Sequence, residues 1–140
     1  MKPKNILLAF LITTLSFGYS SAQKVKMKKG KVTIDKVEIL DFNYEWQLAE
    51  THFLRMGTTE EIVYAKFSNG GTKEYKGDDY TKLYFPEQDV TIESKEVHYG
   101  LKGEMIIKKL IGDGVVTSDG AVDAAKLNAF VKKYHQEFEK

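Results

Sequence analysis

Three histidines, His52, His98 and His135, are the side chains of this 140-residue chain that could act as a general base near neutral pH. Each falls in a different predicted element, so only the fold could bring one of them beside a carboxylate. A pair of carboxylates for glycoside hydrolysis could come from Asp78, Asp79, Glu87 and Asp89. Their separations, which distinguish the two geometries of glycoside hydrolysis, do not follow from the sequence. A hydrolase built from scattered carboxylates and a histidine is therefore one hypothesis for this chain.

Motifs that specify a chemistry on their own are absent from the sequence. The chain has no cysteine, which excludes thiol nucleophiles, thiol redox chemistry and thiolate metal sites. It also lacks the Gly-x-Ser-x-Gly elbow, the phosphate-binding glycine loop and the His-Glu-x-x-His zinc helix. The acidic loop at 113–123 does not fit an EF-hand, because placing Gly120 at the sixth position puts Lys126 at the twelfth, where calcium needs a glutamate. We therefore predict neither a cofactor nor a metal site.

Aromatic side chains are concentrated in the part of the chain that we predict to form strands. They are Tyr44, Trp46, Tyr64, Tyr75, Tyr80, Tyr84 and Phe85. Such rings would form a flat platform for a sugar or a partner protein if exposed on one sheet face, and would fill the core if buried. Tyr84 should point away from Leu83 and Phe85, since neighbours along a strand face opposite sides. Trp46 and Tyr84 are accordingly the candidate ligand-binding residues.

The first 22 residues have the parts of a secretory signal peptide. Lys2 and Lys4 supply the positive start, residues 6–18 are uncharged and largely apolar, and small residues precede Gln23. An uncleaved anchor is the competing hypothesis, but a membrane-spanning helix needs about 20 apolar residues and this run is shorter. Cleavage would export residues 23–140 to the periplasm or the extracellular space. No second long apolar run follows, so the mature form is not expected to span a membrane.

Lysines dominate the residues that follow the expected cleavage site. They are Lys24, Lys26, Lys28, Lys29 and Lys31. We expect residues 23–31 to be a flexible tail, and such a run could make weak contact with an anionic surface. The formal net charge of the whole chain is only +1, so no strongly basic face is expected and nucleic acid is not a predicted partner.

Alternating apolar and polar residues at 32–40, 62–67 and 89–93 predict β-strands, because one face of a strand is then apolar. Further strands are expected at 52–56, 72–75 and 82–85. A hairpin turn is expected at Asn69-Gly70-Gly71, where asparagine and glycine accept the positive φ of tight turns. The middle of the chain is therefore rich in strands.

Apolar spacing becomes helical in the last third of the chain. One helix is predicted over residues 98–111, with Leu101 and Met105 among its apolar positions. A second begins after Asp123, a predicted N-cap. Strands followed by helices predict an α+β fold over residues 32–140, with a mainly antiparallel sheet of about five to six strands followed by two C-terminal helices.

These observations favour a small exported, non-catalytic module that binds a protein or an envelope component, since such a role needs only an accessible surface. The hydrolase is one alternative, and it would need His52 or His98 beside a carboxylate in a cleft. A carrier of lipid or of another small ligand is the other alternative. It would need an apolar cavity inside the sheet or beneath the helices.

Overall fold

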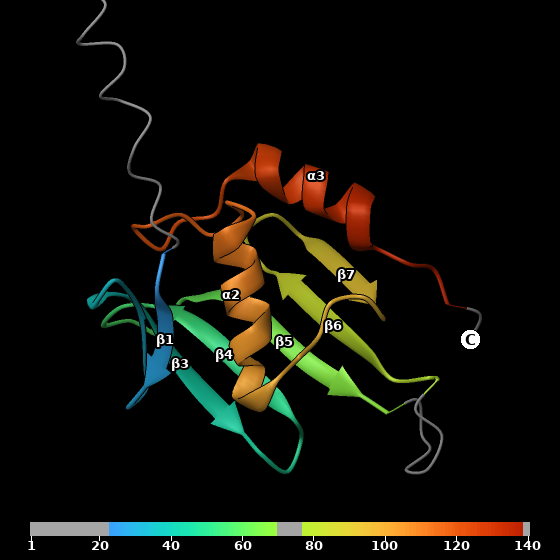
Figure 1. Ribbon diagram of the computed structural model, residues 1–140, viewed down its shortest axis with the longest axis horizontal. Helices are drawn as coiled ribbons and strands as arrows, with labels where there is room; N and C mark the ends of the chain where they lie inside the picture. Colours follow the sequence, from blue (N-terminus) through green and yellow to red (C-terminus); the bar gives the residue numbers. More distant parts are fainter. Residues whose placement is uncertain (1–22, 70–76, 139–140) are drawn as a thin grey trace, which may run out of the picture.

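Seven strands form one antiparallel sheet, which two helices follow in the chain (Figure 1). The structure is a computed structural model that describes residues 23–69 and 77–138. The strands, in their order across the sheet, are β1 (Val25–Lys28), β2 (Lys31–Ile34), β3 (Val37–Glu45), β4 (Glu50–Arg55), β5 (Glu61–Ser68), β6 (Tyr80–Phe85) and β7 (Val90–Ser94). The helical elements are the 3-10 turn η2 (Leu101–Gly103), α2 (Glu104–Gly112) and α3 (Ala124–Tyr134). None of the helices in this described part is long and apolar enough to cross a membrane.

The predicted α+β class is confirmed, with an antiparallel sheet and two C-terminal helices, but the sheet has seven strands rather than five to six. Strand β1 lies where we expected a flexible tail at 23–31. That expectation is wrong for residues 25–28, because Lys29 and Gly30 both adopt positive φ and close a tight hairpin between β1 and β2. The signal peptide predicted at 1–22 and the strand predicted at 72–75 lie outside the described residues, as do the two glycines of the predicted 69–71 turn.

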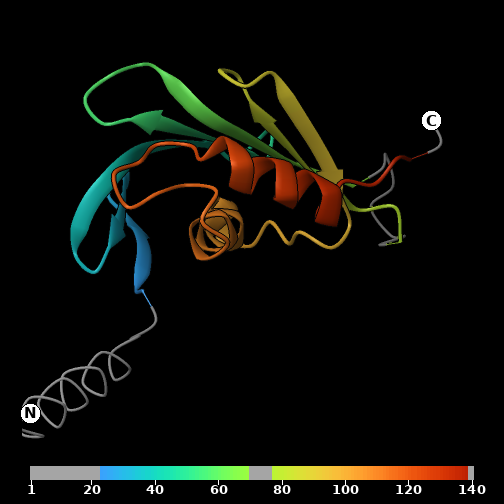
Figure 2. The same cartoon turned by 90° about the horizontal axis from the view of Figure 1, so that it is seen from above.

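Both helices lie on the same face of the curved sheet, and no described helix covers the opposite face, which we call the uncovered face (Figure 2). Strand alternation sends apolar side chains toward the helices, where they are fully buried. The largest of these are Leu40, Phe53, Leu83, Phe85 and Ile92 from the sheet, with Ile106, Ile107, Leu110 and Leu127 from the helices. The uncovered face is mostly polar, as expected for a sheet with one solvated side.

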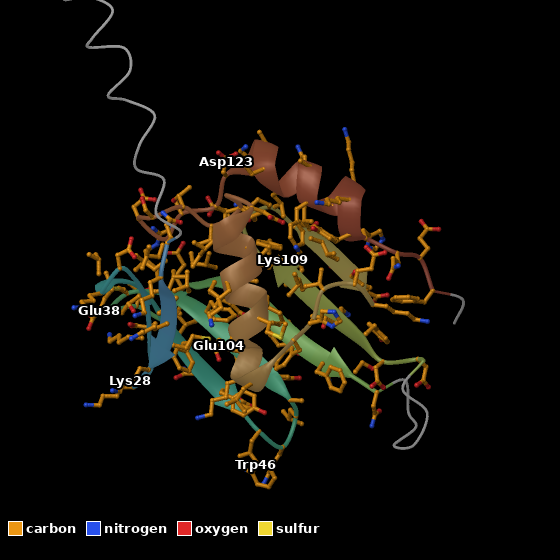
Figure 3. All side chains as sticks on the ribbon, viewed as in Figure 1. Lys28, Glu38, Trp46, Glu104, Lys109 and Asp123 are labelled. Atoms are coloured by element: carbon orange, nitrogen blue, oxygen red, sulfur yellow. The ribbon has the colours of Figure 1, made fainter. Side chains whose placement is uncertain are left out.

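Helix α3 follows its predicted pattern. The Asp123 carboxylate accepts a hydrogen bond from the main-chain N–H of Lys126 at 3.0 Å, so the predicted N-cap is confirmed. Leu127 and Phe130 are buried. Figure 3 shows Lys109 of α2 directed toward α3, where its Nζ lies 4.4 Å from the ring centroid of Tyr134.

Helix α2 begins at Glu104 rather than at residue 98. Gly100, Lys102 and Gly103 have positive φ, which an α-helix does not allow, and they bend the chain into η2 instead. Two residues expected on the apolar stripe of this helix are consequently exposed, with 75% of Leu101 and 50% of Met105 open to solvent. The sequence prediction is wrong for residues 98–103.

Candidate functional site

The described residues include six exposed large apolar side chains, and four of them lie at one end of the sheet. The six are Val37, Trp46, Leu48, Met56, Leu101 and Met105. In a meander the turns alternate between two ends, so the β3–β4 turn with Trp46 and Leu48 is opposite the turns beside Val37 and Met56. Ala49, which completes the β3–β4 turn, lines the same groove as Leu101 and Met105. We call Trp46, Leu48, Leu101 and Met105 the apolar end; Figure 3 shows Trp46 at its outermost tip.

The groove at this end has a volume of about 690 Å³ and is open to solvent. Its lining residues are Tyr44, Ala49, Phe67, His98, Tyr99, Gly100, Leu101, Lys102 and Met105. We refer to it as the Leu101 groove. The sheet supplies one wall, and the segment that returns from β7 to α2 supplies the other. No carboxylate is among the described residues that line it, whose polar side chains are those of two tyrosines, a histidine and a lysine.

A buried pair of hydroxyl groups fixes the outer wall of the Leu101 groove to the sheet. Thr51 of β4 is completely buried, and its Oγ1 donates a hydrogen bond to the carbonyl of Lys102 at 2.9 Å. The hydroxyl of Tyr99 lies 2.5 Å from the same oxygen and donates to it. Burial raises the pKa of Tyr99 to about 12, so this hydroxyl stays protonated and remains a donor at neutral pH.

Two glycines let the chain make this wall. Gly100 has φ 71° and ψ −169°, a conformation that only glycine adopts readily. Gly103 has φ 81°, and a Cβ there would lie 3.0 Å from Thr51 Oγ1. The turn between them carries Leu101. Leu101 is therefore exposed on a backbone that is fixed from both sides, and not on a loosely held loop.

The two sequence-predicted site residues lie in different places. Trp46 is 73% exposed in the β3–β4 turn and belongs to the apolar end. Tyr84 lies on the uncovered face, opposite in direction to the buried Leu83 and Phe85, as its strand alternation predicted. Its hydroxyl donates to Asp89 at 3.2 Å, and its strand neighbour is Tyr64. The structure does not bring Trp46 and Tyr84 together into one platform.

His52 lies beside carboxylates on the uncovered face of the sheet. Its Nδ1 is 3.2 Å from Glu61 Oε1, and its Nε2 is 3.9 Å from Glu50 Oε2. Lys66 Nζ contacts the other oxygen of Glu50 at 3.3 Å. This cluster supplies the histidine–carboxylate contact of the hydrolase hypothesis, but none of its residues lines the Leu101 groove.

His98, in contrast to His52, lines a groove but is not ion-paired with a carboxylate within the described residues. It lines the Leu101 groove and also a smaller hollow of about 320 Å³, which Glu96 and Asp113 share. Within the described ranges, it forms no ion pair with either carboxylate. Neither His52 nor His98 thus combines a carboxylate contact with a cleft. The same ranges contain no cluster of histidine and acidic residues suited to a metal ion.

Glu50, on the uncovered face, should make the free energy of unfolding depend on pH in the acidic range. A hydrogen bond from Tyr64, assisted by Lys66 and His52, holds the pKa of Glu50 below its usual 4.5. Because the folded-state pKa is the lower one, the carboxylate stabilises the fold above about pH 4.5, and this contribution is lost as the pH falls through the folded-state pKa. We expect Glu50→Gln to lose less stability on acidification than the native chain, as measured by urea unfolding at a series of pH values.

Glu45→Gln is the matched control for this measurement. Glu45 lies opposite Glu50 in the register of β3 and β4, is exposed, and forms no ion pair within the described residues. Its replacement should leave the acid dependence of unfolding unchanged. Equal responses from the two variants would contradict the assignment of the effect to the hydrogen-bonded Glu50 carboxylate.

Comparison of the chain with family models, with curated proteins and with solved structures found no match.

Proposed function

We propose that this chain is a small exported, non-catalytic module that binds an apolar segment of a partner protein in the cell envelope through the Leu101 groove. The observation that carries the proposal is Leu101 itself, an apolar side chain 75% exposed on a turn that buried Thr51 holds in place. A preformed anchor of this kind loses little conformational entropy on binding. Trp46, at the same end, is of the residue type most enriched among residues that dominate binding energy.

The open shape of the groove favours a protein segment over a carried small ligand. Small-molecule sites typically bury about 70–90% of the ligand surface. Leu101 and Met105 instead project outward at the margin of an open groove, together with Trp46 and Leu48 of the neighbouring turn. Side chains that protrude can enter pockets on a partner as well as receive its apolar groups. The carrier of lipid or small ligand is therefore the less supported alternative.

The hydrolase alternative is supported only by the contacts of His52 with Glu61 and Glu50. A general base must lie within reach of a bound substrate. His52 faces outward from a sheet surface, and His98 in the Leu101 groove lacks an ion-paired carboxylate within the described residues. A binding role needs only the groove, whereas a hydrolase would need the histidine–carboxylate contact and the groove in the same place.

The export part of the proposal is supported by the leader-like sequence at 1–22. Mass analysis of the protein purified from the cells and from their envelope fraction tests it directly. A mature chain that begins at Gln23 and is recovered outside the cytoplasm is the expected result. An intact chain beginning at Met1 and recovered from the cytosol would contradict export and, with it, an envelope partner.

Site-specific photocrosslinking in the producing cells tests the binding site. A photoreactive amino acid at Leu48 and, separately, at Met105 should give adducts of the same protein partner, because these positions flank the groove from two elements. The same probe at Thr91 on the uncovered face and at Asn128 on the exposed side of α3 serves as control. Adducts from the control positions alone, or a lipid in place of a protein in the adduct, would refute the proposed function.

A further inference from the structure

The two edges of the sheet differ in how the rest of the chain covers them. At β7, the main-chain N–H of Gln136 donates to the carbonyl of Glu93 at 2.8 Å, and the N–H of Glu93 donates to His135 Nδ1 at 3.2 Å. The segment after α3 thereby satisfies part of this edge. At β1, no main-chain hydrogen bond from any described element other than β2 reaches the strand. An edge of this kind is a template for another strand.

The register of the β1–β2 hairpin shows which main-chain groups of β1 are available. Asp35 N–H donates to the carbonyl of Lys24 at 2.9 Å, so the main chain of Lys24 faces β2. Orientation alternates along an antiparallel strand, and the N–H and C=O groups of Val25 and Met27 therefore point outward. These two residues present the donors and acceptors that an added strand would use.

The side chains of β1 divide by chemistry between its two sides. Lys24, Lys26 and Lys28 share one side, are exposed, and follow one another at about 7 Å. None of the three forms an ion pair within the part of the chain that the structure describes. Figure 3 shows Lys28 extending away from the sheet. Val25 and Met27 point to the other side, where they pack against the core.

A second groove lies beside this edge, between the start of β1 and the later part of α2. It has a volume of about 550 Å³ and is lined by Gln23, Lys24, Val25, Lys108, Ile111 and Gly112. We call it the edge groove. The sheet curls at β1 toward the side on which α2 lies (Figure 2). Side chains from a strand added at β1 would enter this groove on the helix side, and none of the described residues that line it is a carboxylate.

We propose that the β1 edge binds an extended segment of a partner protein as an additional strand, with acidic side chains at alternate positions and apolar side chains between them. The acidic side chains would lie opposite Lys26 and Lys28, since cross-strand pairs of opposite charge are favourable. The apolar ones would lie beside Val25 and Met27 and fill the edge groove. A second copy of this chain is a poorer occupant, because pairing β1 with β1 would set lysines against lysines. This proposal is independent of the Leu101 groove.

Two synthetic peptides test the proposal on the full chain, expressed with its leader and purified. One alternates glutamate with valine, and the other alternates lysine with valine. The glutamate peptide should slow hydrogen exchange at the amides of Val25 and Met27, and the lysine peptide should not. Lys26→Glu with Lys28→Glu should weaken binding of the glutamate peptide by about tenfold and confer binding of the lysine peptide. Lys126→Glu with Lys132→Glu, both exposed on α3, is the control of equal charge change and should bind as the native chain does.

Val25→Pro provides a second variant, because proline is tolerated at the first residue of an edge strand and, of the main-chain hydrogen-bonding groups of β1, removes only the outward N–H of Val25. It should weaken binding of the glutamate peptide while the β1–β2 hairpin is retained. Unchanged exchange at Val25 and Met27 with saturating glutamate peptide would overturn the proposal. Two other results would also overturn it. One is lysine-dependent association with anionic vesicles when the peptide has no effect on exchange in β1, and the other is the formation of a dimer through β1.

Discussion

Replacing Trp46 and Leu101 together with serine is expected to weaken binding of the partner crosslinked at the Leu101 groove by about a hundredfold. Central aromatic and aliphatic anchors are each worth about 2 kcal/mol or more in an interface, and their effects do not add fully. Both side chains are mostly exposed in the free protein. Their replacement should therefore change the free energy of unfolding by no more than about 0.5 kcal/mol. Titration of the purified partner by calorimetry measures the first effect, and urea unfolding measures the second.

Val37→Ser with Met56→Ser is the matched control. These residues are also exposed and apolar, at 64% and 43%, but they lie at the opposite end of the sheet. The pair should bind the partner as the native chain does. Equal losses of affinity from the two double variants would indicate a general dependence on surface hydrophobicity, and would contradict a site at the apolar end.

Gly120→Ala is expected to destabilise the fold by about 3 kcal/mol, the largest single-residue effect that we predict. Gly120 has φ 78°, and its N–H donates to the carbonyl of Thr117 at 3.0 Å within the loop that connects α2 to α3. A Cβ at this position would lie 2.5 Å from the main-chain oxygen of Ile39 in β3. Main-chain atoms of a central strand cannot move aside, so the loop would have to separate from the sheet.

Gly57→Ala separates the two contributions to this loss. Gly57 has a similar φ of 70°, but a Cβ there would meet no atom within 4 Å. Its replacement should lower stability by only about 1 kcal/mol, the strain of a left-handed conformation. Urea unfolding of the two variants gives the comparison. If both lose the same amount, the close approach of Gly120 to β3 has no energetic consequence and the packing described for this loop is wrong.

The elements that the sequence predicts correctly are those with a pattern contained within the element itself. The final helix was correctly predicted from Asp123 and the spacing of Leu127 and Phe130, because an N-cap and an apolar stripe are both local features. Strand alternation likewise predicted that Tyr84 faces away from Leu83. Strand β1 was missed because its alternate positions are lysines, which are typical of solvated tails. Its pairing depends on a turn at Lys29 and Gly30 and on β2, and neither partner is visible in the lysine run itself.

The candidate site was predictable only in part. The sequence left two possibilities for the aromatic side chains of the strand region, exposure on a surface or burial in the core. Trp46 is exposed because it lies in the β3–β4 turn. Leu101 and Met105 have the spacing of an apolar helical stripe, so the sequence predicts them on the apolar face of a helix over residues 98–111. The signal that could have corrected this assignment is the pair Gly100 and Gly103, which permits a positive-φ turn where a helix was predicted. Thr51, which holds this turn, is far from it in the sequence, so their contact is visible only in the tertiary structure.

Trp46 is the only tryptophan of the chain, so its fluorescence reports on the proposed site without any label. The most direct measurement is acrylamide quenching of this emission in the free protein and in its complex with the crosslinked partner. If the apolar end is the binding surface, complex formation should shift the emission to shorter wavelength and reduce quenching severalfold. A complex that forms at full occupancy while Trp46 remains as accessible as before would contradict this location of the binding site.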